Sequence, residues 1–295
     1  MTQTFDPRQH MLAQSFEIFH YCDSNLDNVE LHHHDFYEIY LFLSGNVDYS
    51  IESRIYHLLP GDMLLISPLE LHQPRITQEP TPYERIVLWI NKTFLLQFSS
   101  PQTSLTSCFD SNNPRHTNLL RFTPAQREVV KGLMLQLINE TGNKSYGGDL
   151  VSMSLLMRLL VEINRVAQAT PPQYEENDKA AALVQNVLEY INEHYHEELS
   201  LDSIANQFFI SKYHLSHEFN RLVGTSVYRY IVQKRLVIAK QMLSDGIPPT
   251  NAYQHCGFKD YANFFRAFKT TYSINPKKFF ELSQNELKPW QQDAS

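Results

Sequence analysis

A spacing of apolar residues that occurs twice near the carboxyl end constrains the fold of this 295-residue chain more than any other feature. Within residues 199–224, LSLDSIANQFFISKYHLSHEFNRLVG, Leu215 and Phe219 stand four positions apart. Phe264 and Phe268 repeat that spacing 49 positions further on. Side chains at i and i+4 share one face of an α-helix, so each pair predicts a helix that is buried along one stripe. The chain therefore contains a weak internal repeat of helical units.

Residues that begin and end helices flank both predicted stripes. Ser200 can cap a short helix and Ser211 the longer helix after it, because serine side chains accept hydrogen bonds from the free amides of a first helical turn. Gly224 can end the longer helix in the left-handed conformation. Asp260 precedes the second stripe as Ser211 precedes the first. This order predicts two helix-turn-helix units. They span about residues 199–224 and 247–272.

The distribution of charge supports a nucleic-acid-binding region in this part of the chain. The net charge of the whole chain is −7, which taken alone argues against nucleic acid. Residues 206–282, however, carry eleven Lys and Arg against four Asp and Glu, a net of +7, so the rest carries −14. Attraction to phosphates depends on the local field, and a basic region on an acidic protein is sufficient for DNA binding.

The polar side chains opposite the two stripes are candidates for DNA contacts, because a recognition helix reads base edges near its N-terminal end. The predicted DNA-binding residues are Ser211, Lys212, Tyr213, Ser216 and His217 in the first unit and Tyr261, Ala262, Asn263, Arg266 and Lys269 in the second. Arg266 is the strongest candidate for a base contact, since arginine binds guanine through two hydrogen bonds; a phosphate contact or a surface ion pair is the alternative. The lysines are expected to contact phosphates; the alternative is that they are simply exposed to solvent and do not contact DNA.

The amino-terminal part shows a different periodicity. Residues 16–92 contain short strand-like runs separated by Gly, Pro and Ser, which predicts a β-sandwich or small barrel. From Thr123, a potential helix cap, to residue 168 the pattern is helical, and the second helix is apolar on more than one side. Such a helix needs two partners, which we expect to be the barrel and a second copy of the chain. Residues 169–178, ATPPQYEEND, are the predicted linker.

Histidines cluster in LHHHDFYEIYLFLSG, residues 31–45. Strand alternation places His32 and His34 on one face, with Glu38 and Tyr40 sharing a face further on. His72 lies at the end of another predicted strand. Together His32, His34, Glu38 and His72 have the residue types of an iron, manganese or nickel site with open positions. We expect instead a metal-free pocket in which these side chains hold a polar effector or brace the barrel, and no metal cofactor.

The pocket is expected to be lined by aromatic and histidine side chains. The predicted effector-binding residues are His32, His34, Glu38, Tyr40, His72 and Trp89, with Phe42 and Tyr49 as further lining. His33 is expected to face outward. Aromatic faces with a few donors and acceptors suit a sugar or polyol, and they suit an aromatic acid nearly as well.

Several motifs resemble those of a known family. They are Ala205, Ser211, Leu215, Phe219 and Gly224, then Arg235, Leu236, Ala239 and Leu243, then Gly257, Phe258, Phe264, Arg266, Phe268, Lys269 and Pro276. This pattern resembles the AraC/XylS family of bacterial transcription regulators, and the histidine motif is similar to the first cupin motif found in many sensor barrels of that family. The resemblance implies base-reading roles for Tyr213, Ser216 and His217 and for Tyr261, Ala262, Asn263 and Arg266. The chain departs from the family at Asn251, at Pro248 and Pro249, and at Ser273, where most members have glycine.

Taken together, the residues and the resemblance predict an α+β protein. A cupin-like β-barrel or jelly roll with a helical dimerisation segment is expected over 1–168, a linker over 169–178, and an all-α DNA-binding domain over 179–295. The expected function is a dimeric transcription regulator, an activator rather than an enzyme, that binds promoter DNA, responds to a small molecule such as a carbohydrate, and contacts RNA polymerase. The alternatives are a metal-dependent cupin enzyme with a DNA-binding tail and a regulator whose barrel binds only a partner protein.

Composition adds an expectation about location. No stretch approaches the roughly 18 to 20 apolar residues of a membrane span. The first residues, MTQTFDPRQHML, lack the basic start and apolar run of a secretory signal. The three cysteines are far apart, which favours reduced thiols. We therefore expect a cytoplasmic protein that does not bind membranes.

Overall fold

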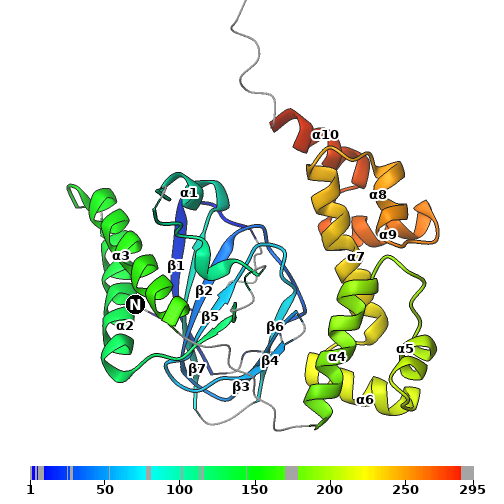
Figure 1. The fold of residues 1–295 in the computed structure, drawn as a ribbon. Coiled ribbons are helices and arrows are strands. Elements are labelled where there is room, and N and C mark those ends of the chain that lie inside the picture. The colour runs from blue at the N-terminus through cyan, green and yellow to red at the C-terminus, as the bar shows by residue number, and fades with distance from the viewer. Residues whose placement is uncertain are drawn as a thin grey trace, which may run out of the picture. The chain divides into compact units, whose positions relative to one another are not determined.

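The computed structural model describes residues 2–3, 5, 10–24, 26, 29–52, 54–77, 81–100, 102–111, 113, 116–143, 145–169 and 179–286. The chain divides into two compact units, Met1–Asn177 and Asp178–Ser295 (Figure 1). The predicted linker, 169–178, lies outside the described residues except for Ala169, where a helix ends. None of the described helices is both long and apolar enough to cross a membrane.

The first unit contains two antiparallel sheets. The larger sheet has the strand order β1 (Phe16–Asp23), β7 (Tyr83–Ile90), β2 (Tyr37–Ser44), β5 (Met63–Ile66) and β8 (Leu119–Leu120). The smaller sheet has the order β4 (Arg54–His57), β3 (Val47–Ile51) and β6 (His72–Ile76). Two facing sheets of short strands are the architecture that the sequence predicts for this region, and the prediction of a cupin-like barrel is confirmed.

Alternation along β2 divides the unit into two apolar layers. Ile39 and Leu41 point to one side of the larger sheet and belong to a cluster shared with helices. Tyr40 points to the opposite side, where it packs with side chains of both sheets, and Glu38 shares its face. Because side chains of a strand alternate with period two, the central strand buries both of its faces and leaves one of them for a barrel interior.

Two helices cover the outer face of the larger sheet (Figure 1). They are α2 (Pro124–Gly142) and α3 (Gly148–Ala169). Thr123 caps α2 as predicted, and a reciprocal contact with Gln126 completes a capping box that satisfies two free amides. The short helices α1 (Lys92–Gln97) and η1 (Ser107–Phe109) lie between β7 and β8 in the chain.

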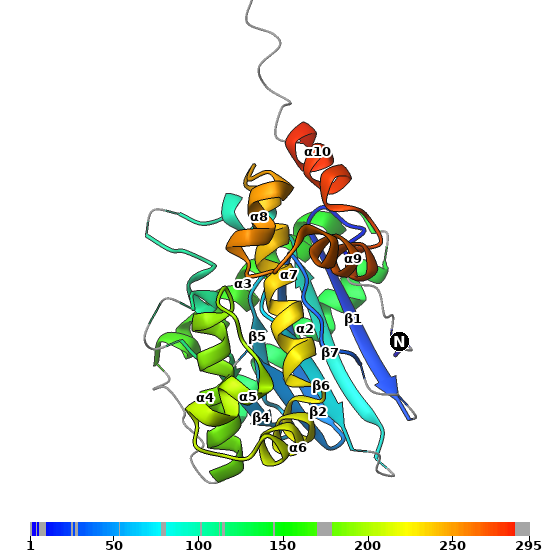
Figure 2. The same cartoon turned by 90° about the vertical axis from the view of Figure 1, so that its right-hand side faces the viewer.

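In the described residues of the second unit the regular structure consists of helices (Figure 2). Its helices are α4 (Lys179–His194), α5 (Leu201–Gln207), α6 (Lys212–Val223), α7 (Val227–Ser244), α8 (Pro249–His255), α9 (Tyr261–Tyr272) and α10 (Pro276–Glu286). The pairs α5–α6 and α8–α9 form the two helix-turn-helix units, and α7 connects them. We call α6 and α9 the recognition helices.

The apolar stripes hold both recognition helices in place. Leu215 and Phe219 of α6 are fully buried, as are Phe264 and Phe268 of α9. The sequence-based assignment of these four residues to the core is confirmed. Burying an aromatic or leucine side chain contributes about 1.5–3 kcal/mol, so each stripe is a main source of stability for its unit.

The departures from the family pattern have physical explanations in the second unit. Pro249 is the first residue of α8 and Pro248 its cap; a proline is tolerated there because the amide of that position has no partner within a helix. Ser273 ends α9 in the left-handed conformation with φ 57°, and Gly224 ends α6 in the same way with φ 77°. A side chain in this conformation is unfavourable, so Ser273 carries a cost that Gly224 avoids.

Candidate functional site

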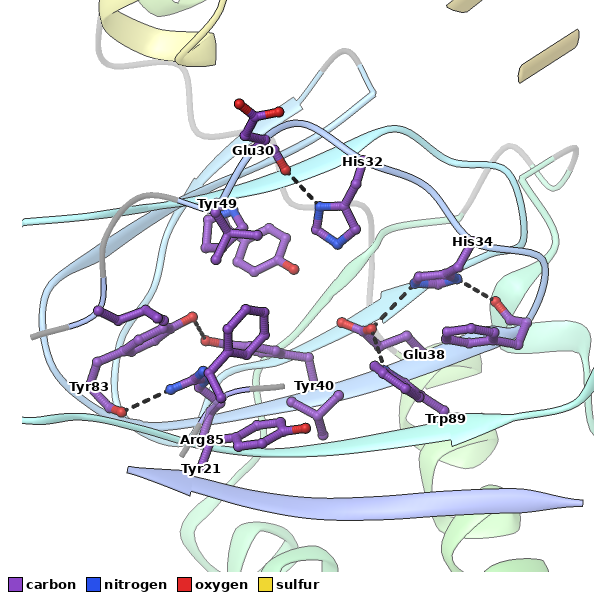
Figure 3. Close-up of a pocket in the computed structure, with 16 residues that line it drawn as sticks. Tyr21, Glu30, His32, His34, Glu38, Tyr40, Tyr49, Tyr83, Arg85 and Trp89 are labelled. Atoms are coloured by element: carbon purple, nitrogen blue, oxygen red, sulfur yellow. Dashed lines mark hydrogen bonds and ion pairs between the residues drawn. The ribbon is translucent and has the colours of Figure 1, made fainter. Parts of the chain in front are cut away.

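The barrel interior contains a cavity of about 420 Å³ between the two sheets (Figure 3). Its lining combines aromatic and aliphatic side chains with histidine, glutamate and arginine. The lining residues are Phe5, Tyr21, Leu26, Val29, Glu30, His32, His34, Phe36, Glu38, Tyr40, Tyr49, Pro74, Tyr83, Arg85, Val87 and Trp89. A cavity of this size and composition suits a small ligand.

Most residues predicted to bind an effector meet at this cavity. His32, His34, Glu38, Tyr40 and Trp89 all line it, as does Tyr49. His72 is fully buried and is absent from the lining; it lies against the ring of His32, with ring centroids 4.2 Å apart.

Two expectations about neighbouring residues are wrong. Phe42 does not line the cavity, because it is fully buried in the apolar cluster between the sheets. His33 does not face outward but is only 7% exposed. His33 precedes the regular strand β2, so strand alternation gives no guide to its orientation.

Arg85 is the main lining residue that the sequence analysis missed. Its side chain is 2% exposed, and Nη1 donates hydrogen bonds to Asp23 Oδ2 at 2.5 Å and to the Tyr83 carbonyl at 3.2 Å. The guanidinium also lies 4.1 Å from the centroid of the Tyr83 ring, in cation–π geometry. Its position could have been inferred from β7, where Arg85 is in phase with Val87 and Trp89.

Burial sets the protonation of the polar groups at this side of the cavity. Tyr40 and Tyr83 share a hydrogen bond between their hydroxyl groups. Burial raises the pKa of Tyr40 and of Tyr49 and raises that of Tyr83 to about 12, so all three phenols are neutral donors at physiological pH. Burial opposes the charge of Arg85, whereas the neighbouring carboxylate of Asp23 favours it.

The carboxylate of Glu38 lies on another side of the cavity, where Trp89 binds it (Figure 3). Trp89 Nε1 donates a hydrogen bond of 2.8 Å to Glu38 Oε2. His34 Nε2 lies 3.3 Å from the same oxygen without forming a hydrogen bond with it. Because the Trp89 and Glu38 side chains come from paired positions on β7 and β2, the sheet itself fixes the carboxylate.

Three imidazoles next to this carboxylate have fixed tautomers. The Nδ1 atoms of His32, His34 and His72 lie 2.8, 2.9 and 2.9 Å from the backbone carbonyls of Glu30, Phe36 and Glu70. A carbonyl can only accept, so each neutral imidazole carries its proton on Nδ1 and leaves Nε2 as a lone pair. Burial lowers the pKa of His32 and lowers that of His72 well below its usual value, which favours these neutral forms. Donor atoms of His34, Glu38 and His72 lie within 4.8 Å of one another and could hold a metal ion.

The exposed face of α6 carries the predicted first-unit residues. Ser211 caps the helix by accepting from the His214 amide at 3.2 Å. The side chains of Lys212, Tyr213, Ser216 and His217 are exposed, and Tyr213 is 80% exposed. Lys212 Nζ lies 3.2 Å from Asp202 of α5, so this cation has an acidic neighbour within its own unit.

Glu218 engages two neighbouring side chains of α6. His217 Nδ1 lies 2.9 Å from Glu218 Oε1, and Arg221 Nη2 lies 2.7 Å from Glu218 Oε2. Hydrogen bonds from His217 and then Arg221 lower the pKa of Glu218, so the carboxylate stays charged beside the face expected to meet DNA.

The exposed face of α9 is organised by a chain of hydrogen bonds. The Asn263 amide donates to Asp260 Oδ1 at 2.7 Å, and its Nδ2 donates to Asp260 Oδ2 at 2.6 Å. Arg266 Nη2 in turn donates to Asn263 Oδ1 at 2.6 Å. Ala262, Asn263, Arg266 and Lys269 are exposed, as expected for residues that could reach DNA.

Tyr261 departs from its predicted position on the exposed face. Its ring packs edge-on against Tyr253 at 5.7 Å and Phe264 at 5.9 Å, and the side chain is half-buried at the margin of the core. The first residue of α9 points toward α8, which the spacing of apolar residues in α9 alone did not reveal. Tyr261, expected on the outward face, is therefore only partly exposed, and its predicted role in DNA contact stays a prediction.

Comparison with known families agrees with both parts of this description. Residues 15–160 match the AraC-like ligand binding domain, and residues 204–281 match a helix-turn-helix domain. This chain belongs to the AraC family of transcription regulators. It is a DNA-binding regulator that responds to a small molecule.

Two relatives of this AraC-family regulator match it over most of both chains. The HTH-type transcriptional activator RhaS of Escherichia coli O157:H7 is 22% identical over 248 residues, covering 83% of this chain and 85% of RhaS. The probable transcriptional regulator LumQ of Photobacterium leiognathi is 24% identical over 250 residues, covering 84% of this chain and 90% of LumQ. These relatives are transcription regulators.

Solved structures show weaker similarity. ToxT from Vibrio cholerae strain SCE256, bound to an unsaturated fatty acid, is 14% identical, with 92% of this chain and 96% of ToxT covered and a TM-score of 0.39. The DNA-binding domain of AdpA in complex with a target DNA is 18% identical, with 39% of this chain and all of that domain covered and a TM-score of 0.33.

Proposed function

We propose that the effector of this regulator is an uncharged molecule rich in hydroxyl groups, a sugar or similar polyol, that binds in the barrel cavity. The composition of the lining carries this proposal. Aromatic rings offer apolar faces to a sugar ring, while the neutral phenols of Tyr40 and Tyr49 and the carboxylate of Glu38 offer hydrogen bonds.

The charges of the lining favour a neutral effector over an aromatic acid. Among the lining residues that the structure describes, Arg85 is the only Lys or Arg, and Asp23 already neutralises it. Glu38 adds a negative charge that would repel a carboxylate. A buried anion without a free cationic partner is strongly unfavourable.

The effector acts by shifting the protein between conformations that differ in their fit to promoter DNA. It can shift this equilibrium only by its difference in affinity for the two conformations. We propose that the result is activation of a nearby promoter through contact with RNA polymerase in the cytoplasm, and that the barrel catalyses no reaction. The RhaS relatives are transcriptional activators, which supports the direction of this effect.

We propose that the chain functions as a homodimer through α2 and α3. Val129 and Leu135 of α2 and Leu150 and Val151 of α3 are large apolar side chains that are 40–72% exposed. Exposed apolar residues gathered on neighbouring helices are a feature of protein interfaces. Sedimentation of the purified protein should give twice the chain mass, and Leu150→Lys together with Val151→Lys should shift it toward the monomer.

The effector proposal is tested by thermal denaturation of the full chain in the presence of aldoses, deoxy sugars, polyols and aromatic acids. A specific ligand at 100 times its dissociation constant adds about 2.7 kcal/mol to stability. At least one hydroxyl-rich compound should raise the melting temperature. A response confined to aromatic acids would refute the proposed effector class.

A matched pair of substitutions places the ligand in the cavity. Tyr40→Phe removes a hydroxyl that lines the cavity, whereas Tyr56→Phe removes one that is buried in the same barrel against Asn118. The stabilisation by the active compound should fall in Tyr40→Phe and persist in Tyr56→Phe. Equal losses in both variants would show that the effect is general and not local to the cavity.

DNA binding is tested by gel shift with DNA from upstream of neighbouring operons. The full chain should bind at least one such fragment more tightly than a random duplex of equal length at physiological salt. Equal affinity for both would leave only the sequence-independent electrostatic attraction.

A further inference from the structure

We propose that Arg235 is a positioning residue that fixes the distance between the two recognition helices and thereby selects the spacing of their sites on DNA. It acts on residues 195–198, which lead from α4 into α5 of the first helix-turn-helix unit; we call them the α4–α5 segment. This segment reaches the turn between α8 and α9, so it joins the two units at a place other than α7. The inference goes beyond the proposed function, because it concerns the geometry of DNA binding and does not depend on the effector.

Arg235 holds the α4–α5 segment against α7. Its Nε donates a hydrogen bond of 2.7 Å to the Tyr195 carbonyl, and its Nη2 donates one of 2.7 Å to the Glu197 carbonyl. Hydrogen bonds from a charged donor are roughly twice as strong as neutral ones, and a planar guanidinium can make both at once. The same guanidinium lies 5.9 Å from the centroid of the Phe258 ring, which belongs to the apolar cluster of the second unit. Arg235 therefore contacts both units.

A glycine of the second unit makes room for the same segment. A Cβ atom at Gly257 would lie 2.7 Å from the carbonyl oxygen of His196 and 2.8 Å from that of Tyr195. Glycine is the residue that allows two stretches of backbone to approach so closely. Any other residue at this position would push the α4–α5 segment away from the α8–α9 turn.

The corresponding turn of the first unit shows that the turn itself does not require glycine. Phe209 occupies the place in the α5–α6 turn that Gly257 occupies in the α8–α9 turn, since the amide of each donates to the carbonyl three residues earlier. Both backbones are left-handed, with φ 54° at Phe209 and 80° at Gly257. Phe209 is 96% exposed, so the first turn accepts a large side chain where space is open. The close approach of the α4–α5 segment is therefore what excludes a side chain at Gly257.

An ion pair joins the two units at the same place. Lys259 of the α8–α9 turn pairs with Glu198 of the α4–α5 segment. Both side chains are 75% exposed, and an ion pair in water contributes little to stability. The connection therefore depends mainly on Arg235 and on the close fit at Gly257.

A direct connection between the units affects which DNA sites the protein can bind. Figure 2 shows α6 and α9 toward opposite ends of α7. Two linked binding modules gain affinity from each other only where the spacing of their sites matches the distance between them. One extra base pair moves the second site by about 3.4 Å and turns it by roughly 35° about the duplex axis. Because the α4–α5 segment restrains the second unit, the protein should discriminate against such a change.

The test selects binding sites for the full chain from a random DNA library. The unchanged protein should select two blocks of preferred base pairs at one spacing, and one extra base pair between them should weaken binding at least about tenfold, as the loss of base contacts does. Arg235→Lys keeps the charge but lacks the planar pair of donors, so the same insertion should cost less than about threefold. Gly257→Ala should relax the spacing in the same way, and it carries the test if Arg235→Lys does not fold.

Tyr230→Phe is the matched control. Tyr230 also lies on α7, but its hydroxyl donates to Asn192 Oδ1 at 3.3 Å and its ring packs against Phe219, both on the side of the first unit. Its spacing preference should equal that of the unchanged protein. Circular dichroism establishes folding, and a loss of folded protein lowers affinity at both spacings equally, so the ratio of the two affinities reports positioning alone. A ratio that stays at tenfold in folded Arg235→Lys and Gly257→Ala, or an unchanged protein without a preferred spacing, would overturn the proposal.

Discussion

The recognition helices α6 and α9 share a scaffold but differ in how their exposed charges are engaged. Each is 12 residues long and begins at a capping side chain, Ser211 in one and Asp260 in the other. On α6 the carboxylate of Glu218 engages the imidazole of His217 and the guanidinium of Arg221. On α9 the guanidinium of Arg266 is held by the neutral amide of Asn263.

This difference affects what each helix can offer to DNA. An arginine paired with a carboxylate must give up or share that partner to bind a phosphate or a base, whereas one oriented by an amide keeps its full charge. Asn263 also holds the Arg266 side chain in one orientation, which lowers the entropy lost on binding. We therefore expect base specificity to depend more on α9 than on α6.

The largest effect should be the loss of stability when a buried phenylalanine of either recognition helix is truncated. Phe219→Ala and Phe264→Ala should each destabilise the second unit by about 3–5 kcal/mol, because each leaves a cavity in a fully buried stripe. Urea denaturation followed by circular dichroism measures the loss, and DNA binding should disappear with the fold. Tyr213→Ala, which removes a side chain that is 80% exposed, is the control and should leave stability almost unchanged. A cost below about 1 kcal/mol for either phenylalanine would contradict the buried repeat.

A smaller effect, on DNA affinity and base preference, should distinguish α9 from α6. Arg266→Ala should weaken specific binding by about 1–3 kcal/mol and relax the preference at one base position. His217→Ala should cost less, since His217 is already engaged by Glu218. Selection of binding sites from a random library measures both affinity and preference. Arg165→Ala, in α3 of the first unit, controls for the change in net charge. An unchanged preference profile in Arg266→Ala, or a larger loss in His217→Ala, would reverse the comparison.

Neutralising the acid of α6 should make that helix more like α9. Glu218→Gln should tighten DNA binding and steepen its dependence on salt, because the substitution removes a negative charge from the helix face expected to meet phosphates. The matched control is Glu162→Gln, which removes the carboxylate of another i, i+3 pair, with Arg165, in the first unit. Binding is measured by fluorescence anisotropy at several salt concentrations. An equal or weaker affinity in Glu218→Gln would show that the carboxylate positions the helix and does not restrain its cations.

The smallest effect should be the change in stability when the residues that end α9 and α6 are exchanged between serine and glycine. Ser273→Gly should stabilise the second unit by about 0.5–1 kcal/mol, because glycine adopts the left-handed conformation without steric cost. Gly224→Ser at the end of α6 should destabilise by about 1–2 kcal/mol. The two opposite substitutions control for each other in the same denaturation assay. A loss of stability in Ser273→Gly would indicate that interactions of the serine side chain offset the cost of its left-handed backbone conformation.

The sequence predicted the helical unit in detail because its determinants are local. Caps at Ser200, Ser211 and Asp260 and the i, i+4 stripes act within a few residues, so spacing alone located the helices and their buried faces. Tyr261 was misplaced because its partner Tyr253 lies on a different helix. The DNA-binding roles of the exposed residues remain predictions.

In the barrel, the sequence determined which face of β2 is inward and which histidines lie near Glu38, because strand alternation has a fixed period. Only the tertiary structure decided that His33 is buried, that Arg85 reaches the cavity paired with Asp23, and that three backbone carbonyls fix the histidine tautomers. Those features depend on hydrogen bonds with loop carbonyls and on contacts between strands distant in the sequence. Periodicity constrains the direction of a side chain, but its partner is set by how the sheets and loops pack together.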